Sequence, residues 1–525
     1  MQRMKGIVIG FVVAATGLAT AAASVAAPPP AAEIDVSVER AMKEFNVPGM
    51  AVSVVLDGKL VYAKGLGIVE VGSRQHVSDR TLFQIGSVSK AFTAAALAIL
   101  VDEGKLDWDG RVIDYLPEFR MEDPWVTREF TIRDLLTHRS GLPLGAGDLL
   151  IFPDSNATVD DVLHALRYLK PATSFRSRFA YDNLMYIVAG EVVARIAGMP
   201  VEDFLEQRVL APLGMNDCVA AVDRAHPGAV LATPHMLVDG NLVTTTSRVT
   251  DLVSAAGGIN CSARGMGKWM TFMLDGGAKA DGERLVSEEQ FGQLVGPVTL
   301  LPVSPYLKEH AGSSLSAYAL GWNISTFYGQ AIWSHGGGVW GMTTFIAILP
   351  EQHLAVFATG NQLSVAPHAV VYDLLDRFLR DSTQDAGQDW ISIIADTIHE
   401  RRSKADEVVA AARDARDADS TPRLPLADYA GSYRDDWYGE VHISLTEDGR
   451  LWFKSERNPP LEGPLEHFQY DTFIARWKDR RLKADAYVTF SLDPAGKVER
   501  IRMKVVSPAT DFSYDFRDLD LRRVE

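Results

Sequence analysis

Two alternating hydrophobic runs open the patterned part of the chain. They occupy residues 49–66 and are separated by an Asp-Gly pair at 57–58, which favours a tight turn between antiparallel strands. Residues 87–103 form an alanine-rich apolar stretch that Gly104 ends. This stretch predicts a helix with Ser87 at its start, where a serine side chain can cap free backbone N–H groups.

Helical patterning then dominates from about residue 107 to 310, and strand patterning returns after it. The expected helices span residues 131–137, 158–168, 181–197 and 262–274. The expected strands span residues 317–327, 331–335, 342–349 and 353–359, followed by a helix over about 367–380. Because strands bracket the helical stretch, we expect one mixed sheet with an inserted helical lobe, and a site in the cleft between them.

The last part of the chain has a different pattern. Residues 385–418 are charged and alanine-rich, which predicts an exposed connecting helix, and residues 426–525 hold short strands with turn signals that predict a small β-barrel or sandwich. We therefore expect four segments: a signal peptide (1–26), a catalytic domain (27–383), a helical linker (384–421) and a C-terminal β domain (422–525).

The first residues have the pattern of a secretory signal peptide. Arg3 and Lys5 precede an uncharged apolar stretch at 6–23, and the small residues at 24–26 suit cleavage near Ala26. The alternative is an uncleaved membrane anchor. We expect a cleaved, exported protein in the periplasm or outside the cell, with no other membrane association.

Composition narrows the classes of function. The chain has 525 residues, of which 47% are hydrophobic and 23% charged, so it can build a sizeable core and is not disordered. A net charge of −16 disfavours nucleic acid as a partner. Two cysteines exclude a disulfide-built scaffold and a four-cysteine zinc site. In an oxidising compartment, Cys218 and Cys261 either pair or remain separate buried thiols.

The first chemical motif is a serine followed three residues later by a lysine. On a helix, Ser87 and Lys90 share one face, and the positive helix N-terminus favours both a developing alkoxide and a neutral amine. A desolvated lysine can then act as the base that a serine nucleophile needs. The alternative is a capping serine beside a surface lysine.

Two further motifs lie far downstream. Tyr181-Asp182-Asn183 combines a phenol with an amide, although a plain helix cap is the alternative. His335 is followed by three glycines at 336–338, which let backbone approach a ligand and leave an N–H group for an oxyanion, although a flexible turn is the alternative.

Together these motifs resemble the penicillin-recognising serine hydrolases. The order Ser-x-x-Lys, Tyr-x-Asn and His-x-Gly, with Leu-Leu-Thr-His-Arg-Ser-Gly-Leu at 135–142, is most similar to their class C β-lactamase-like branch, which includes esterases and D-aminopeptidases. The resemblance covers about residues 35–380 and implies an α/β (α+β) fold of the β-lactamase/transpeptidase type, with an antiparallel sheet flanked by helices. The tail resembles a small β domain often attached to these hydrolases.

The resemblance implies a role for each motif residue. Ser87 would be the acylated nucleophile, with Lys90 and Tyr181 sharing the work of the general base. Asn183 would bind the substrate's amide carbonyl. The N–H groups of Ser87 and Gly338 would form the oxyanion hole.

One departure from the family pattern bears on the substrate. His335 stands where β-lactamases of this branch carry a lysine, so that His335, Gly337 and Gly338 would line the substrate site without a permanent cation. This favours peptide, amide or ester substrates over β-lactams. We expect His138 to be structural.

The sequence leaves several hypotheses about function open. The first is an exported serine peptidase or esterase, of which a peptidase for linearised cyclic peptides of the microcystin type is one candidate. The others are a β-lactamase or D,D-peptidase, and a non-catalytic receptor resembling penicillin-binding proteins. The sequence implies no metal, nucleotide or other cofactor. It does not indicate an oligomeric state.

Overall fold

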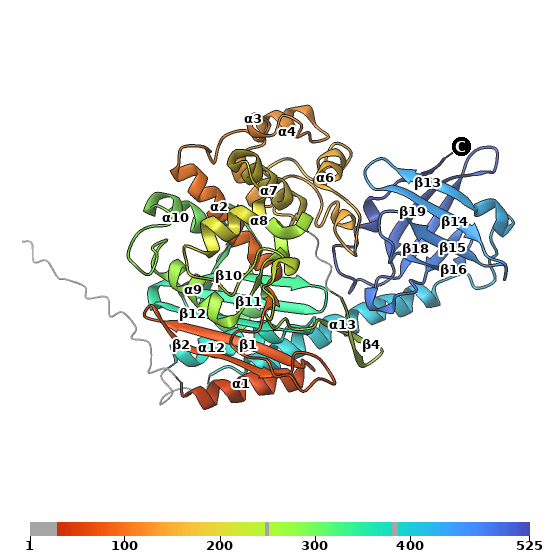
Figure 1. The fold of residues 1–525 in the computed structure, drawn as a ribbon. Coiled ribbons are helices and arrows are strands. Elements are labelled where there is room, and N and C mark those ends of the chain that lie inside the picture. Colours follow the sequence, from red (N-terminus) through yellow and green to blue (C-terminus); the bar gives the residue numbers. More distant parts are fainter. Residues whose placement is uncertain (1–28, 247–250, 381–386, 525) are drawn as a thin grey trace, which may run out of the picture.

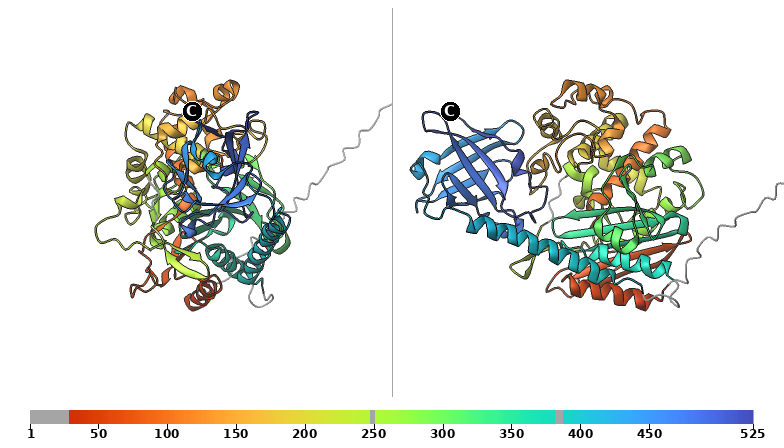
Figure 2. Two further views of the ribbon diagram at one scale, coloured as in Figure 1. Left: turned by 90° about the vertical axis from the view of Figure 1, so that its right-hand side faces the viewer. Right: turned by 180° about the vertical axis from the view of Figure 1, so that it is seen from behind.

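A computed structural model describes residues 29–246, 251–380 and 387–524. The predicted signal peptide at 1–26 lies outside the described residues. A large α/β body and a small β-barrel lie side by side, joined by one long helix (Figures 1 and 2). The structure confirms the predicted fold class: an antiparallel sheet with flanking helices, an inserted helical lobe and a C-terminal barrel.

The body is built on an eight-stranded sheet. Its strand order is β2 (Lys59–Gly67), β1 (Gly49–Leu56), β12 (Leu354–Gly360), β11 (Met342–Leu349), β10 (Gln330–Val339), β9 (Asn323–Phe327), β8 (Ser316–Tyr318) and β7 (Thr299–Leu300). The chain therefore enters the sheet at β1 and β2, leaves it for the helical lobe, and returns to build the other six strands.

Both faces of the sheet are buried. Along β12, Leu354 and Val356 belong to one hydrophobic cluster and Ala355 and Phe357 to another, as the two-residue period of a strand requires. The first cluster includes α1 (Ala31–Glu44) and α12 (Ala366–Leu379), while the second includes α2 (Ser89–Asp102) and α9 (Ala263–Leu274). This burial on both sides explains why the strands read as nearly continuous apolar runs.

The lobe consists of short helices around the longer α2 and α7. Its elements and the small strands beside it are α3 (Val112–Tyr115), α4 (Pro124–Glu129), α5 (Ile132–Leu136), α6 (Val159–Ala165), α7 (Leu184–Ala197), α8 (Val201–Phe204), α10 (Glu288–Val295), α11 (Pro305–Ala311), β3 (Phe83–Gln84), β4 (His235–Val238), β5 (Asn241–Thr244) and β6 (Asn260–Cys261). Short 3-10 or π turns complete it: η1 (Gly86–Val88), η2 (Asp148–Leu150), η3 (Leu205–Leu210), η4 (Val222–Arg224), η5 (Asp251–Val253) and η6 (Ser254–Gly258). Outside the lobe, the 3-10 turn η7 (Pro350–Gln352) joins β11 to β12.

Local capping explains where several predicted helices begin. Thr131 and Thr158 each form a capping box with the aspartate three residues later, at the starts of α5 and α6. The predicted helix at 181–197 begins only at Leu184.

The predicted helix at 87–103 also begins later than expected. Its α-helical part starts at Ser89, and Ser87 lies in the preceding 3-10 turn η1. Despite this later start, the side chains of Ser87 and Lys90 lie on the same side and are within hydrogen-bond distance of each other.

Two strand predictions need correction. The run 317–327 is broken between β8 and β9, where Gly321 has a φ of +84° and lies so close to α2 that a Cβ there would be 2.9 Å from the Cα of Ala91. The glycines at 336–338 are not a flexible turn. They pair with Phe345, Thr344 and Thr343 of β11 as part of β10.

The C-terminal part forms a closed barrel after α13 (Trp390–Asp414), which runs from the body to the barrel (Figure 2). Its strands and turns are η8 (Leu426–Tyr429), β13 (Gly431–Asp435), β14 (Gly439–Leu445), β15 (Leu451–Ser455), β16 (Glu462–Gln469), β17 (Thr472–Ala475), η9 (Arg480–Leu482), β18 (Ala486–Leu492), β19 (Val498–Val505), η10 (Phe516–Asp518) and β20 (Leu521–Arg523). The buried residues of α13 lie in its first turns, apart from Ala405, as expected of a connecting helix.

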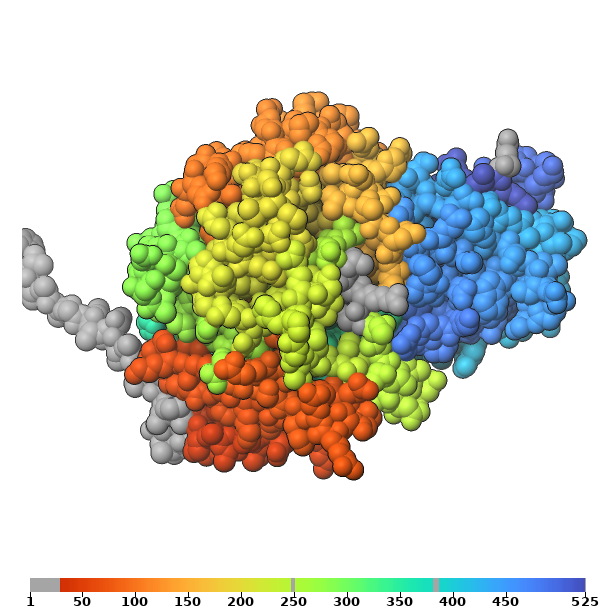
Figure 3. Space-filling view, in the orientation of Figure 1, coloured from red at the N-terminus to blue at the C-terminus, as the bar shows by residue number. Residues whose placement is uncertain are grey.

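The barrel packs directly against the lobe (Figure 3). Arg457 pairs with Asp161 at 3.1 Å, and the Asn458 side chain donates to the carbonyl oxygen of Pro153 at 2.7 Å. These contacts fix the orientation of the barrel relative to the body.

The described residues contain neither a single membrane-spanning helix nor a metal-binding cluster. No single helix there is long and apolar enough to cross a membrane, although the bent pair Leu184–Ala197 and Val201–Leu210 passes the same test by length and composition. No group of three or more histidine, cysteine, aspartate and glutamate side chains in those ranges is arranged to hold a metal ion.

Cys218 and Cys261 form a disulfide that closes a sequence separation of 43 residues, with a Cα–Cα distance of 4.2 Å. In the loop-closure model, a bridge over this length stabilises the folded state by about 4 kcal/mol, because it lowers the entropy of the unfolded chain.

We expect the double variant Cys218→Ser/Cys261→Ser to lose about 2–4 kcal/mol of stability, measured by thermal or urea unfolding. Wild-type protein denatured without reductant should show no reactive thiol. Two reactive thiols per chain would contradict the bridge.

Candidate active site

Ser87 lies where the η1 turn meets strand β10. A Cβ added at Gly337 would collide with the carbonyl oxygen of Ile85, and one added at Gly86 would lie 2.9 Å from the backbone nitrogen of Gly338. Only glycine allows the two segments to approach this closely. The approach brings the backbone of Ser87 and Gly338 together at the edge of a cavity, as an oxyanion hole requires.

Lys90 is fully buried and its amine donates three hydrogen bonds. They run to Ser87 Oγ at 3.1 Å, to Asn183 Oδ1 at 2.9 Å and to the carbonyl oxygen of Ala256 at 2.8 Å. Ala256 belongs to the π turn η6, a type of irregularity that is frequent at functional sites. The amine therefore points at the serine oxygen with its own position fixed from two other elements.

Burial lowers the pKa of Lys90 to about 7, against the opposing effect of the carboxyl groups of Asp148 and Asp182. The same low-polarity surroundings raise the pKa of Asp148 to about 8 and that of Asp182 to about 7. An amine that loses its proton near neutral pH is suited to take a proton from a serine hydroxyl.

Tyr181 precedes α7 and contacts the same amine. Lys90 Nζ lies 4.9 Å from the centre of the Tyr181 ring, which also packs on His138 with 4.2 Å between ring centres. Burial raises the pKa of Tyr181, with a hydrogen bond from Ser87 opposing the shift. The phenol therefore keeps its proton at neutral pH.

His138 supports this loop from behind. It is buried, its Nδ1 accepts a hydrogen bond from the backbone N–H of Asp182 at 3.1 Å, and burial holds its pKa well below the ordinary value. Its contacts are with the loop that carries Tyr181, which agrees with the structural role expected for it.

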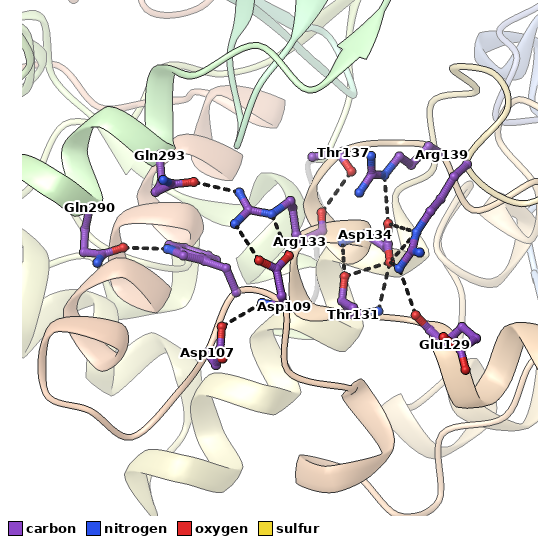
Figure 4. A network of polar contacts seen from close by, with 12 residues as sticks. Asp107, Asp109, Glu129, Thr131, Arg133, Asp134, Thr137, Arg139, Gln290 and Gln293 are labelled. Carbon is purple, nitrogen blue, oxygen red and sulfur yellow. Dashed lines mark hydrogen bonds and ion pairs between the residues drawn. The ribbon is translucent and has the colours of Figure 1, made fainter.

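An aspartate outside the sequence motifs fixes the same region. Asp134 on α5 is buried, and it accepts hydrogen bonds from Thr131, Arg139 and Arg176 (Figure 4). Burial favours a higher pKa for Asp134, but these hydrogen bonds hold it below the ordinary value. The backbone of Arg176 in turn donates to the carbonyl oxygen of Arg139, so that the two loops on either side of His138 are tied together.

Asn183 is held on its other side by Asp148. Its Nδ2 donates to Asp148 Oδ2 at 2.9 Å, and the same oxygen accepts a hydrogen bond from Ser513 of the barrel at 2.8 Å. This arrangement fixes which way the amide points, because Oδ1 faces Lys90 and Nδ2 faces the carboxyl group.

His335 is buried and neutral. Burial lowers its pKa to about 3, with the nearby Lys90 acting in the same direction. Its Nδ1 donates to the carbonyl oxygen of Gly336 at 2.7 Å, and its Nε2 accepts from the Tyr318 hydroxyl at 2.9 Å. Both ring nitrogens thus have protein partners, and His335 supplies no positive charge to the site.

A cavity of about 530 Å³ opens over these groups. The catalytic body supplies Ser87, Tyr181, Asn183 and His335 to its wall, and the barrel supplies residues 481–483 and 509–514. A larger cavity of about 1050 Å³ lies between β10 and α13 and shares Gly336 and Gly338 with the first. Strand β10 is therefore open to solvent-accessible space along this edge.

The structure brings together all the residues that the sequence singled out: Ser87, Lys90, Tyr181, Asn183, His335, Gly337 and Gly338. Sequence reasoning missed Asp148, Tyr318 and the barrel residues Phe512 and Ser513. Asp148 falls in a loop whose pattern carries no signal, and Ser513 lies 365 residues further along the chain. Only their contacts in the fold reveal them.

Comparisons with known proteins agree with this geometry. The family described as Beta-lactamase matches residues 34–380, and a domain of unknown function, DUF3471, matches residues 415–523. An unguisins hydrolase from Aspergillus campestris is 29% identical over 482 residues, covering 87% of this chain and 86% of that protein. Penicillin-binding protein 4 from Amycolatopsis lactamdurans is 27% identical over 328 residues, covering 58% of this chain and 79% of that protein.

A beta-lactamase from Pseudomonas fluorescens is 32% identical over 193 residues, covering 36% of this chain and 50% of that protein. Among solved structures, an octameric penicillin-binding protein homologue from Pyrococcus abyssi superposes with a TM-score of 0.61 at 21% identity, covering 90% of this chain and 98% of that chain. SurE superposes with a TM-score of 0.52 at 21% identity, covering 94% and 99%. With the family matched over residues 34–380, the chain belongs to the beta-lactamase family of serine hydrolases.

Proposed function

We propose that this protein is an exported serine hydrolase that cleaves an amide or ester bond through an acyl-enzyme on Ser87. The observation that carries the proposal is the contact of 3.1 Å between Ser87 Oγ and the buried amine of Lys90. This contact joins a nucleophile that reaches a cavity to a base whose pKa is lowered to about 7 by burial.

The acylation step follows from the positions of the groups. Lys90 accepts the hydroxyl proton of Ser87 as Oγ forms a bond to the substrate carbonyl carbon. The N–H groups of Ser87 and Gly338 stabilise the resulting oxyanion. The bond from carbon to the leaving nitrogen or oxygen then breaks, and the proton held by Lys90 passes to the leaving group through the Tyr181 hydroxyl.

Deacylation uses the same groups in reverse order. Lys90, again neutral, takes a proton from a water molecule as the water oxygen attacks the acyl carbon. The bond between the acyl carbon and Ser87 Oγ breaks, and the proton returns to Ser87. The net reaction is hydrolysis of one amide or ester bond, and no cofactor takes part in it.

The cavity wall formed by β10 favours a hydrophobic substrate without a carboxylate next to the scissile bond, whereas the cations Arg481 and Lys483 lie on the barrel wall. His335 is neutral, so no permanent cation stands at its position on β10. The apolar side chains that line the cavity include Phe152, Met236, Val339, Trp340, Leu363 and Phe512. The similarity to unguisins hydrolases along most of the chain supports hydrolysis as the reaction.

A β-lactamase or D,D-peptidase is the second candidate, supported by the similarity to proteins named beta-lactamase and penicillin-binding protein 4. We place it second because His335 lacks the charge that would bind a penicillin carboxylate. Export is part of the proposal because of the pattern at 1–26, and the Cys218–Cys261 disulfide suits an oxidising compartment.

The nucleophile is tested by labelling with a fluorophosphonate, which attaches covalently to activated serines. We expect the wild-type protein to be labelled at Ser87, and Ser87→Ala to lose both labelling and hydrolysis, by about 10³-fold or more. The exposed Ser491 on the barrel offers a matched control. Ser491→Ala should behave as wild type, and labelling of Ser87→Ala at an undiminished rate would contradict the proposal.

The general base is tested by the pH dependence of that labelling. Lys90 can accept the Ser87 proton only in its neutral form. The rate of labelling at Ser87 should therefore rise with pH and reach half its maximum near pH 7, because burial lowers the pKa of Lys90 to about 7. Four titratable groups interact electrostatically with the amine: Asp148, Asp182, His138 and His335. The measured midpoint therefore reports the ionisation of Lys90 coupled to these groups. A rate independent of pH between 5 and 9 would be incompatible with Lys90 as the base.

The substrate preference is tested by comparing a p-nitrophenyl ester with a chromogenic cephalosporin that carries a carboxylate. We expect the wild type to favour the neutral ester in kcat/KM, because no cation is present at His335. His335→Lys should lower the ratio of kcat/KM for the ester to kcat/KM for the cephalosporin about tenfold, as expected for one new charge-assisted contact. A wild type that favours the cephalosporin would instead support the second candidate.

A further inference from the structure

The barrel sends one loop into the active site. This loop, residues 509–515, follows β19 and lies against the segment of the body that includes Gly145. A Cβ at Gly145 would be 2.7 Å from the Phe512 ring, and the φ of this glycine is +69°. The carboxyl group of Asp515 accepts hydrogen bonds from the backbone N–H groups of Gly147 at 2.6 Å and Leu149 at 3.0 Å.

These contacts hold the residue between the two bonded N–H groups, which is Asp148. Asp148 is fully buried in the η2 turn, and its Oδ2 accepts hydrogen bonds from Ser513 at 2.8 Å and from Asn183 at 2.9 Å. Asn183 Oδ1 then accepts from Lys90 at 2.9 Å. A continuous chain of hydrogen bonds therefore leads from the barrel to the amine beside Ser87.

The charges around Asp148 make its orientation consequential. Burial raises its pKa to about 8, while the hydrogen bonds from Ser513 and Asn183 oppose that rise. The carboxyl groups of Asp182 and Asp515 lie nearby and disfavour its charged form, and Lys90 is the cation that faces it. Any change in the ionisation of Asp148 is felt by the amine, because the two groups interact electrostatically.

Phe512 adds a second contact with the reacting groups. Its ring meets the Tyr181 ring edge to face, with 5.9 Å between centres, and it lines the cavity beside Ser87. The barrel thus supplies an apolar wall as well as a polar contact.

We propose that the loop at 509–515 is an integral part of the active site, with Ser513 acting as a positioning residue that sets the orientation and basicity of Lys90 through Asp148 and Asn183. This inference rests on the proposed serine hydrolase function. It assigns the C-terminal domain a direct part in the chemistry, beyond stabilising the fold.

The test compares full-length wild type, Ser513→Ala, Ser513→Thr and the control Ser491→Ala. Each is labelled with the fluorophosphonate between pH 5 and 9, and thermal unfolding is measured alongside. Loss of the Ser513 hydroxyl raises the pKa of Asp148, so that the carboxyl group keeps its proton to higher pH and stabilises the ammonium form of Lys90 less.

We therefore expect Ser513→Ala to lower the maximal labelling rate about tenfold and to shift the rise in labelling rate to lower pH. Ser513→Thr retains a hydroxyl and should keep the wild-type midpoint. A residue that only stabilised the fold would lower the unfolding temperature without moving the pH midpoint.

A double-mutant cycle with Asp148→Asn isolates the path. Asparagine retains an oxygen that accepts hydrogen bonds but does not titrate, so Ser513→Ala in that background should produce no further shift in the pH midpoint. Equal shifts in both backgrounds would overturn the inference. So would a Ser513→Ala profile that superimposes on wild type. A wild type that is not labelled at all would overturn the proposed function and this inference together.

Discussion

The buried amine of Lys90 is the constraint around which the active site is arranged. A lysine side chain enclosed in protein is costly in its charged form, so its surroundings must either neutralise it or satisfy its donors. Here three acceptors, from the η1 turn, the N-cap of α7 and the η6 turn, do so, and burial brings its pKa to about 7. Each of those acceptors has to be held by its own neighbours, which links distant segments of the chain.

Close backbone packing is the second requirement. Gly86 and Gly337 let the turn that carries Ser87 approach β10 closely enough for the N–H groups of Ser87 and Gly338 to lie together. Pairing of the three glycines with β11 makes this edge rigid despite their freedom as isolated residues. The close approach of these two segments is thus a product of sheet register as much as of local sequence.

Whether these features can be predicted from the sequence depends on how far apart along the chain the residues that determine them lie. Hydrophobic periodicity and local signals such as the Asp57-Gly58 turn identified the hairpin, the main helices and a C-terminal β domain, because such signals lie within a few residues of one another. Ser87 and Lys90 were identifiable from their spacing, and the other motifs from their order along the chain. The break at Gly321, the strand character of 336–338 and the part of Asp148 depend on packing between segments, which no local pattern encodes.

The position of Ser513 near the end of the chain has a consequence for biosynthesis. Proteins emerge from the ribosome N-terminal part first, so the body with Ser87 and Lys90 is complete in sequence well before the barrel loop appears. Asp148 acquires its hydrogen-bond partner only after a further 365 residues have been translated. The order of synthesis therefore delays completion of this hydrogen-bonded network until the barrel loop has been made.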